Sequence, residues 1–323
     1  MIISRRILAG LALASAVVAT AHAQAWPNKP VRLVVPFPAG GGTDLIGREV
    51  TQKISEATKW SFIIDNKPGS GGNIGIDNVA KSPADGYSLV LGQTSNLAIN
   101  PSLYSKLPYD PVKDLTPISM VASAPLALVV SATSPYRSFN DLVAAAKAKP
   151  GALNFATSGN GTVAHLAMEM FQKEAGVKLM HVPYKGAAQG INDVISERVE
   201  VYVSSIPTLI GHIKNGKMRA LAVTSLKRVD DLPQTPTIAE SGYKGFEAVT
   251  WFGILGPANL PKDVTARLNT EINKALQLPA LQKQLNDQGA DVAGSTPEAF
   301  AKLISEDIVR WGKVVKDAGA KLD

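Results

Sequence analysis

The sequence contains no cysteine. Disulfide bonds, zinc–thiolate sites and cysteine nucleophiles are therefore excluded. Histidine is scarce as well, with four in the whole chain. His165, His181 and His212 lie too far apart in sequence to form a compact metal motif. We therefore expect neither a bound metal nor another cofactor.

Concentrated charge and nucleotide-binding motifs are also missing. Without Arg5 and Arg6 the chain has 31 basic against 27 acidic residues, a net charge of +4. This is a mild bias toward anionic partners, without the basic stripe of a nucleic-acid-binding protein. No Gly-x4-Gly-Lys-Ser/Thr phosphate loop occurs, and Gly40-Gly41-Gly42 lacks the spacing of a dinucleotide fingerprint. We expect no nucleic acid as a partner.

Residues 1–23 have the three parts of a secretory signal peptide. Two adjacent arginines precede the apolar segment 7–18, and Ala21-His22-Ala23 is a small-x-small cleavage site. The apolar segment is short for a bilayer span, which needs ~20 residues. The pattern predicts export to the periplasm with cleavage near Ala23. The arginine pair faintly resembles a twin-arginine signal, but such pairs are ordinary, and we favour the general secretion route.

Strand-like and helical segments alternate along the rest of the chain, which indicates an α/β fold with largely parallel sheets. Two long apolar segments, 120–131 and 249–256, are interpreted as strands that cross between two lobes. One lobe would then comprise residues 24–124 plus 249–323, and the other residues 125–248. A ligand would lie in the crevice between the lobes, at the carboxyl ends of the strands.

Two helix starts carry clear sequence signals. Ser138-Phe139-Asn140-Asp141 resembles a capping box. Thr296-Pro297-Glu298 combines a favourable N-cap residue with proline at the first helical position. We expect one helix to begin after Ser138 and the last helix to begin after Thr296.

Glycine-rich turns follow two of the expected strands. The apolar run 31–35 leads into the turn 37–44 and then into a helix over 45–59. Glycine allows backbone N–H groups to approach a ligand, and a helix N-terminus adds unpaired donors and positive potential. A second turn, 157–162, precedes a helix over 163–175 in the other lobe. Three or four hydrogen bonds of ~1.5–3 kcal/mol each suffice for micromolar binding, which needs about 8 kcal/mol.

The turns after the strands therefore supply the candidate ligand-binding residues. In the first turn they are Phe37, Ala39, Gly40, Gly41, Gly42, Thr43 and Asp44. In later turns they are Thr94, Ser95, Ser158, Gly159, Thr162, His165 and Tyr184. Each turn could equally be an ordinary βα connection, in which Gly, Ser and Thr are common. His165 is interpreted as a hydrogen-bonded residue near the cleft, and Phe37 and Tyr184 as flanking the body of the ligand.

A secreted serine hydrolase is the alternative class. Ser158 lies about two helical turns before His165. A nucleophile elbow requires Gly-x-Ser-x-Gly, however, and Ala156 and Asn160 occupy the two glycine positions. We therefore expect no enzyme activity. Turnover of ester substrates that Ser158→Ala abolishes would support the hydrolase instead.

Short motifs distributed over the chain carry a family resemblance. They lie at 35–44, 66–75, 83–87, 100–104, 158–162, 182–186, 212–217 and 219–224. In this order and number they make the chain similar to the periplasmic solute-binding receptors of tripartite tricarboxylate transporters, also called Bordetella uptake gene receptors. The resemblance covers nearly the whole mature chain, from Trp26 to about Lys321.

The resemblance implies a periplasmic binding protein-like fold of type II. Such a fold has two lobes, each with a central, mostly parallel sheet flanked by helices, joined by two crossing strands. The loops at 37–44 and 157–162 would hold a ligand carboxylate, partly through ordered waters. The implied partners are a small carboxylate and a two-component inner-membrane permease, and we expect a monomer. A ligand-sensing receptor for a signalling partner on the same fold is the alternative function.

One departure from the family pattern concerns ligand charge. Relatives often carry aspartate after the strand that ends here at Val203, whereas this chain has Ser204 and Ser205. We add both serines to the candidate residues and interpret the change as removal of a negative charge from the cleft. The hypothesis is a ligand without an ammonium group, either a simple organic acid or an aromatic carboxylate. Tight binding of a cationic amino acid, with none of its deaminated analogue, would contradict this hypothesis.

Overall fold

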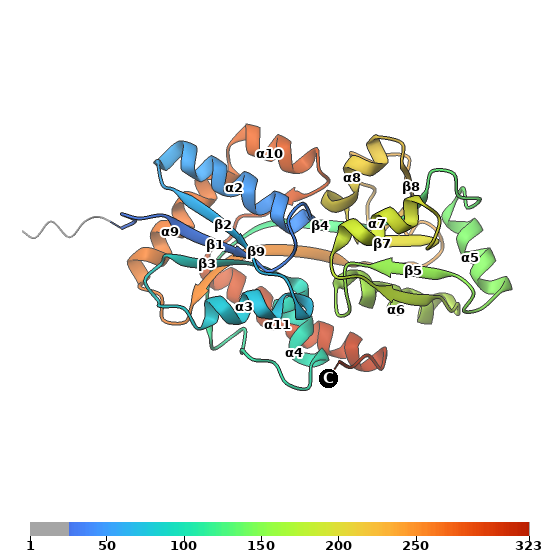
Figure 1. The fold of residues 1–323 in the computed structure, drawn as a ribbon, viewed down its shortest axis with the longest axis horizontal. Helices are drawn as coiled ribbons and strands as arrows, with labels where there is room; N and C mark the ends of the chain where they lie inside the picture. Colours follow the sequence, from blue (N-terminus) through green and yellow to red (C-terminus); the bar gives the residue numbers. More distant parts are fainter. Residues whose placement is uncertain (1–25, 323) are drawn as a thin grey trace, which may run out of the picture.

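The computed structural model describes residues 26–322, and the signal peptide predicted for residues 1–23 lies outside them. The described chain is a mixed α/β protein in which helices flank a long, curled sheet (Figure 1). Within residues 26–322, no helix combines the length and the apolar character that crossing a membrane requires.

One half of the sheet is built from the first βα units. β1 (Val31–Val35) consists of apolar residues around one arginine, and four of its five residues are buried. It pairs in parallel with β2 (Phe62–Asn66) and with β3 (Ser88–Gln93). We call this part of the molecule the β1 half. It also contains the short strand β10 (Asp291–Val292) and the helices α2 (Gly42–Thr58), α3 (Asn73–Ala80), α4 (Asn100–Leu103), α9 (Lys262–Leu276), α10 (Pro279–Asn286) and α11 (Pro297–Asp317).

The other half repeats this arrangement. β5 (Asn154–Thr157) pairs in parallel with β6 (Met180–Pro183) and with β7 (Val201–Ser205), and β8 (Met218–Val223) pairs with β4 (Leu115–Ser131). We call this part the β5 half. Its helices are α5 (Phe139–Ala148), α6 (Val163–Ala175), α7 (Ala187–Ile195) and α8 (Ile206–Lys214).

Two long strands connect the halves. β4 and β9 (Val249–Pro257) pair antiparallel with each other over the register Leu115↔Pro257 to Pro125↔Val249. The resulting strand order is β2-β1-β3-β9-β4-β7-β5-β6. β1, β2 and β3 are parallel to one another, and so are β5, β6 and β7, whereas pairs that involve β4 or β9 are antiparallel. The exact division of the chain into lobes at 124/125 and 248/249 stays a prediction.

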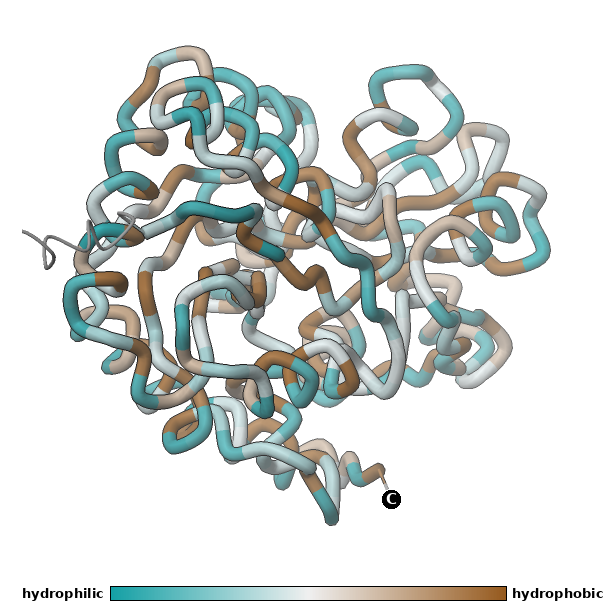
Figure 2. Tube along the Cα trace, turned by 60° about the vertical axis from the view of Figure 1, so that its left-hand side comes forward, coloured by the Kyte–Doolittle hydropathy of each residue, from teal (hydrophilic) through white to brown (hydrophobic). Residues whose placement is uncertain are grey.

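Apolar residues cover both faces of the sheet in each half. One apolar cluster lies under α2 and α9 and includes Val31, Leu33, Ile46 and Val50. A larger cluster, which also reaches α11, includes Phe139, Phe155 and Phe171. Figure 2 shows the hydrophobic stretches running through the interior strands and the hydrophilic stretches in the outer turns. Burial of these side chains at roughly 25 cal/mol per Å² is the main force that holds the sheet and helices together.

Both helix starts with clear sequence signals are confirmed. Ser138 accepts a hydrogen bond from the Asp141 amide, and the Asp141 side chain accepts one in return, so a capping box opens α5. Thr296 accepts from the Ala299 amide at the start of α11. The helix predicted over 45–59 begins earlier, at Gly42. Its N-cap is Gly41, which makes no side-chain capping hydrogen bond, so the sequence carries no capping signal at this start.

Candidate functional site

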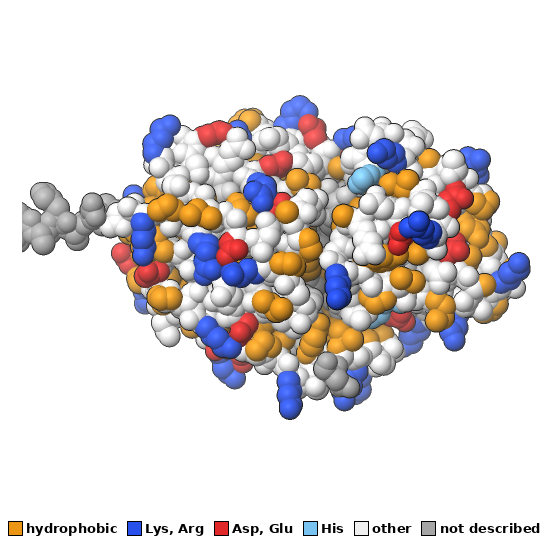
Figure 3. Space-filling view, in the orientation of Figure 1, with side chains coloured by type: hydrophobic (Ala, Val, Ile, Leu, Met, Phe, Trp, Pro, Cys, Tyr) orange, Lys and Arg blue, Asp and Glu red, His pale blue; other side chains and the backbone are white. Residues whose placement is uncertain are grey.

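A cavity of about 370 Å³ lies where the β1 half meets the β5 half. Figure 3 shows the hollow between the two halves in the middle of this face of the molecule. We call it the inner cavity. Its walls come from the turn before α2, from the ends of β3 and β7, from the middle of β4, and from the starts of β9, α6, α7 and α8.

Four helices point their N-termini at the inner cavity. α2 contributes Gly42 and Thr43, and α6 contributes Val163 and Ala164. α7 adds its first residues, at 187–189, and α8 adds Ser205, its N-cap, and Thr208. Each helix N-terminus carries about half a positive elementary charge and unpaired N–H donors. The combination favours an anion in the cavity.

The charged side chains around the inner cavity reinforce this preference. Of the described residues, no aspartate or glutamate lines the cavity, and Lys185 is the one lysine or arginine that does. His212 also lines it, and burial, followed by the charge of Lys217, lowers the pKa of this histidine. His212 is therefore neutral at pH 7. An anionic ligand would meet no fixed negative charge among the described residues that line the cavity.

The first glycine-rich turn is held from behind by Asp44. Its side chain is 3% exposed and accepts hydrogen bonds from the Gly40 amide, from Arg48 Nε and from Asn66 Nδ2, each at 2.9 Å. Burial alone would raise the pKa of Asp44, but the hydrogen bonds from Arg48, Gly40 and Asn66 outweigh it and lower the pKa. Asp44 therefore shapes the turn and does not itself line the cavity.

The first turn also contacts the opposite half directly. The Gly42 amide donates to Thr208 Oγ1 at 3.1 Å, so the first donor of α2 is satisfied by α8. Among the described residues, no acceptor pairs with the amide of Thr43, which lines the cavity and remains available to a ligand. The two halves therefore touch at the end of the cavity where α2 begins.

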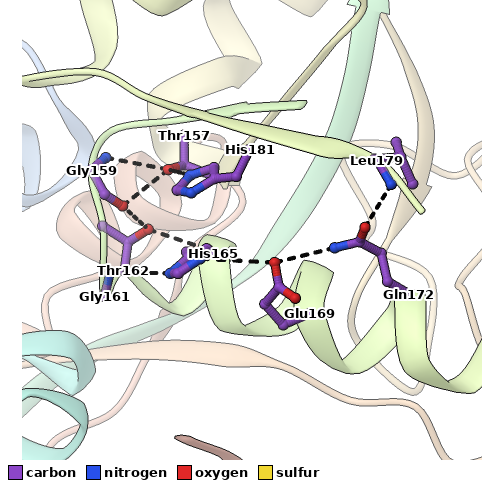
Figure 4. A network of polar contacts seen from close by, with 9 residues as sticks. All are labelled: Thr157, Gly159, Gly161, Thr162, His165, Glu169, Gln172, Leu179 and His181. Atoms are coloured by element: carbon purple, nitrogen blue, oxygen red, sulfur yellow. Dashed lines mark hydrogen bonds and ion pairs between the residues drawn. The ribbon is translucent and has the colours of Figure 1, made fainter. Parts of the chain in front are cut away.

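The second turn is held together by a network of hydrogen bonds around His165 (Figure 4). Thr162 Oγ1 donates to the Gly159 carbonyl at 3.0 Å and accepts from the His165 amide at 3.3 Å. The Gly161 amide donates to His165 Nδ1 at 3.3 Å. His165 therefore fixes the turn from behind, as expected for a residue near the cleft, and does not line the inner cavity.

A second histidine lies against the first. The rings of His165 and His181 stack with centroids 4.1 Å apart and 13° between their planes. Thr157 Oγ1 lies 2.8 Å from His181 Nε2. Burial lowers the pKa of His165 to about 4, and burial together with the neighbouring His165 lowers that of His181 to about 3. Both rings are therefore neutral at pH 7, so the stacked pair has no repulsion between like charges.

Ten of the sixteen predicted residues line the inner cavity. They are Phe37, Ala39, Gly40, Gly41, Gly42, Thr43, Ser158, Thr162, Ser204 and Ser205. Their predicted contact with a ligand stays a prediction.

The remaining six predicted residues do not line the inner cavity. Thr94 is fully buried and accepts from the Trp251 amide at 2.9 Å, and Ser95 accepts from Gln93 at 3.0 Å, so both hold the strand ends together. Asp44 and His165 lie behind the two turns. Gly159 and Tyr184 line a separate hollow described below.

That hollow adjoins the inner cavity and has a volume of about 490 Å³. We call it the outer pocket. Tyr184 lies in its wall, and its hydroxyl donates to Asp193 Oδ2 at 2.7 Å. Burial and this hydrogen bond raise the pKa of Tyr184 to about 12. The phenol hydroxyl therefore makes its hydrogen bond within the β5 half.

The sequence reasoning missed several residues that line the inner cavity. They are Pro38, Gln93, Leu126, Val163, Ala164, Lys185, Gly186, Ala187, Ala188, Gln189, Ile191, Thr208, His212 and Thr250. Of these, Lys185 and Gly186 lie in a turn that sequence analysis linked to the cleft, and Gln93 directly precedes the candidate Thr94.

Comparison with known families places the fold and the cavity in context. A family model described as "Tripartite tricarboxylate transporter family receptor" matches residues 46–320. A protein from the tcbD–tcbE intergenic region of Pseudomonas sp. strain P51 is 40% identical over 96% of this chain and 93% of its own length. Protein BugT of Bordetella pertussis is 37% identical over 98% of both chains.

Solved structures give the same picture. Periplasmic binding protein BugD is 34% identical, with a TM-score of 0.87 over 92% of this chain and 99% of its own. Rpa4515 of R. palustris, solved with adipate, is 37% identical, with a TM-score of 0.89 over 92% of this chain and 100% of its own. MatC of Rhodopseudomonas palustris, solved with malate, is 27% identical, with a TM-score of 0.83 over 90% of this chain and 100% of its own.

Proposed function

The chain belongs to the tripartite tricarboxylate transporter receptor family, and on that premise we propose that it captures a small organic acid anion in the inner cavity and delivers it to a two-component membrane permease. As a periplasmic solute-binding receptor of this family, it acts in the periplasm. Rpa4515 and MatC, which bind adipate and malate, support a carboxylate as the ligand of this chain too.

The observation that carries the proposal is the convergence of four helix N-termini on a cavity without carboxylates. A ligand carboxylate would take the free amide at the start of α2 and those at the starts of α6 and α7. Each charge-assisted hydrogen bond contributes ~1.5–3 kcal/mol, so a few of them offset the cost of immobilising the ligand. Because none of the described residues in the wall is acidic, a ligand ammonium group would find no carboxylate partner there.

We infer that the cavity serves binding and not catalysis. Among the described residues, no hydrogen bond joins Ser158 to His165, and His165 Nδ1 already accepts from the Gly161 amide. A serine nucleophile needs a base within hydrogen-bond reach. Contacts between the halves, such as Gly42 with Thr208, would instead exclude water from a bound anion when the cleft closes.

A thermal-shift and calorimetry screen tests the proposal. We expect one or more mono-, di- or aromatic carboxylates to bind, and a ligand at 100 times its Kd to add ~2.7 kcal/mol to stability. Matched amines and the corresponding amino acids serve as controls and should not bind. A protein that binds no carboxylate, or that prefers the amino acid to its deaminated analogue, would contradict the proposal.

A further inference from the structure

Lys185 lies where the inner cavity meets the outer pocket. The two chambers share six lining residues, namely Phe37, Pro38, Ser158, Thr162, Lys185 and Gly186. The chambers therefore adjoin along the contact between the first turn and the residues just before α7. A ligand whose carbon chain continues well beyond its first carboxylate would extend past this point into the outer pocket.

The position of Lys185 is fixed by its neighbour. A Cβ at Gly186 would lie 2.8 Å from Pro38 Cγ, so the backbone at Gly186 packs directly against the opposite half. Gly186 also has a φ of +125°, which a residue with a side chain adopts only with strain. The lysine is thus placed at the rim of the inner cavity wherever the two halves are in contact.

Lys185 meets no acidic side chain in the part of the two chambers that residues 26–322 form. Of these residues, it is the one lysine or arginine that lines either chamber, and none that lines them is aspartate or glutamate. Within residues 26–322, Lys185 takes part in no ion pair. The carboxylates that hold the first turn and Tyr184 have other partners, since Asp44 is held by Arg48 and Asp193 by Tyr184 and Arg198.

We propose that Lys185 is a specificity-determining residue that pairs with a second acidic group of the ligand, at the end of the inner cavity that meets the outer pocket. This inference rests on the proposed function. The first carboxylate occupies the amides at the starts of the helices, and the body of the ligand passes Phe37 and Pro38. The second carboxylate reaches the lysine ammonium at the junction with the outer pocket. The receptor then prefers diacids to monoacids of equal chain length.

The test is calorimetry with matched pairs of straight-chain acids of four to six carbons, adipate and hexanoate among them. Wild-type protein is compared with Lys185→Met, which keeps the length of the side chain without its charge, and with Lys185→Arg. Lys178→Met is the control, because Lys178 is an exposed lysine of the same half that lines neither chamber and takes part in no ion pair among the described residues.

We expect Lys185→Met to weaken the best-bound diacid about three- to tenfold and to leave the matched monoacid within about twofold, the range of one partly exposed charge pair. Lys185→Arg and Lys178→Met should bind like the wild type. The loss caused by Lys185→Met should shrink as salt is raised, because screening weakens the pair.

Two results would overturn the role of Lys185 while leaving the proposed function intact. One is an equal effect of Lys185→Met on the diacid and the monoacid, or no effect on either. The other is a wild type that binds monoacids as tightly as, or more tightly than, the matched diacids. If the wild type binds no acid at all, the proposed function fails and this inference fails with it.

Discussion

At the scale of single residues, Gly42 decides how closely the two halves approach. A Cβ at this position would lie 3.0 Å from Thr208 Oγ1 and 3.1 Å from Ser205 Oγ, both in the opposite half. The backbone of Gly42 begins α2 and has ordinary helical geometry, so alanine fits the local conformation. The constraint on this residue is therefore the contact across the cleft.

We predict that Gly42→Ala weakens ligand binding about three- to tenfold without destabilising the fold. The added methyl group opposes the contact with Thr208, whereas alanine in a helix is favoured over glycine by roughly 0.5–1 kcal/mol. Calorimetry measures the first effect and urea unfolding the second. Gly211→Ala in α8 is the control, because nothing lies within 4 Å of its added Cβ. Unchanged affinity of Gly42→Ala would show that this contact plays no part in binding.

Individual residues also show what sequence reasoning can reach. Ser204 and Ser205 were chosen from the family pattern, and both line the inner cavity. Thr94 and Ser95 were chosen from a polar turn, but both are buried and bonded to strand ends. Composition identifies a turn that ends a strand, but it does not determine which side chains face the cleft, because this depends on how the turn packs.

At the scale of secondary-structure elements, the helix starts with side-chain caps were predicted, whereas α7 and α8, which have none, were not. Ser138 and Thr296 carry recognisable caps, and both helices begin after them. α7 and α8 begin at Gly186 and Ser205, neither of which makes a side-chain capping bond. An N-terminus without a side-chain cap leaves no capping signature, and three of the four helix starts at the cavity, those of α2, α7 and α8, are of this kind. Capping signals therefore identify only one of these four starts, that of α6.

The turn before α6 depends on the stacked histidines. Burial disfavours the charged form of both imidazoles. It lowers the pKa from the ordinary 6.5 to about 4 for His165 and, together with the neighbouring His165, to about 3 for His181. Glu169, on the same helix, lies 3.8 Å from His165 Nε2, and burial raises its pKa. Because the folded-state pKa values of the histidines are lowered, the unfolded chain binds more protons below pH 6.5. The stability that the neutral pair contributes is present above that pH and is lost as the pH falls toward 4.

We predict that acidification from pH 7 to pH 5 destabilises the wild type by about 3–4 kcal/mol more than it destabilises the double variant His165→Gln/His181→Gln. The comparison uses the change in unfolding free energy with pH, so a constant loss from the substitutions cancels. Urea unfolding at both pH values provides the measurement. An equal pH dependence in the two proteins would show that the histidines do not titrate with unfolding in this range.

At the scale of the whole molecule, the α/β architecture and the long crossing strands follow from the sequence pattern. The apolar segments predicted to cross lie within β4 and β9, which pair antiparallel and join the two halves. Their antiparallel pairing with β3 and β7 could not be derived from apolar periodicity, because a buried strand looks alike in either direction. The position of the cavity depends on this pairing, since it brings the starts of α2, α6, α7 and α8 together.

The most direct test of the account is a crystal structure of the protein with its tightest-binding acid. We expect one carboxylate of that acid in the inner cavity, with its oxygens within hydrogen-bond distance of the Thr43 amide in the β1 half and of amides at the starts of α6 or α7 in the β5 half. An acid bound outside the inner cavity, or one whose carboxylate points away from these helix N-termini, would contradict the central claim.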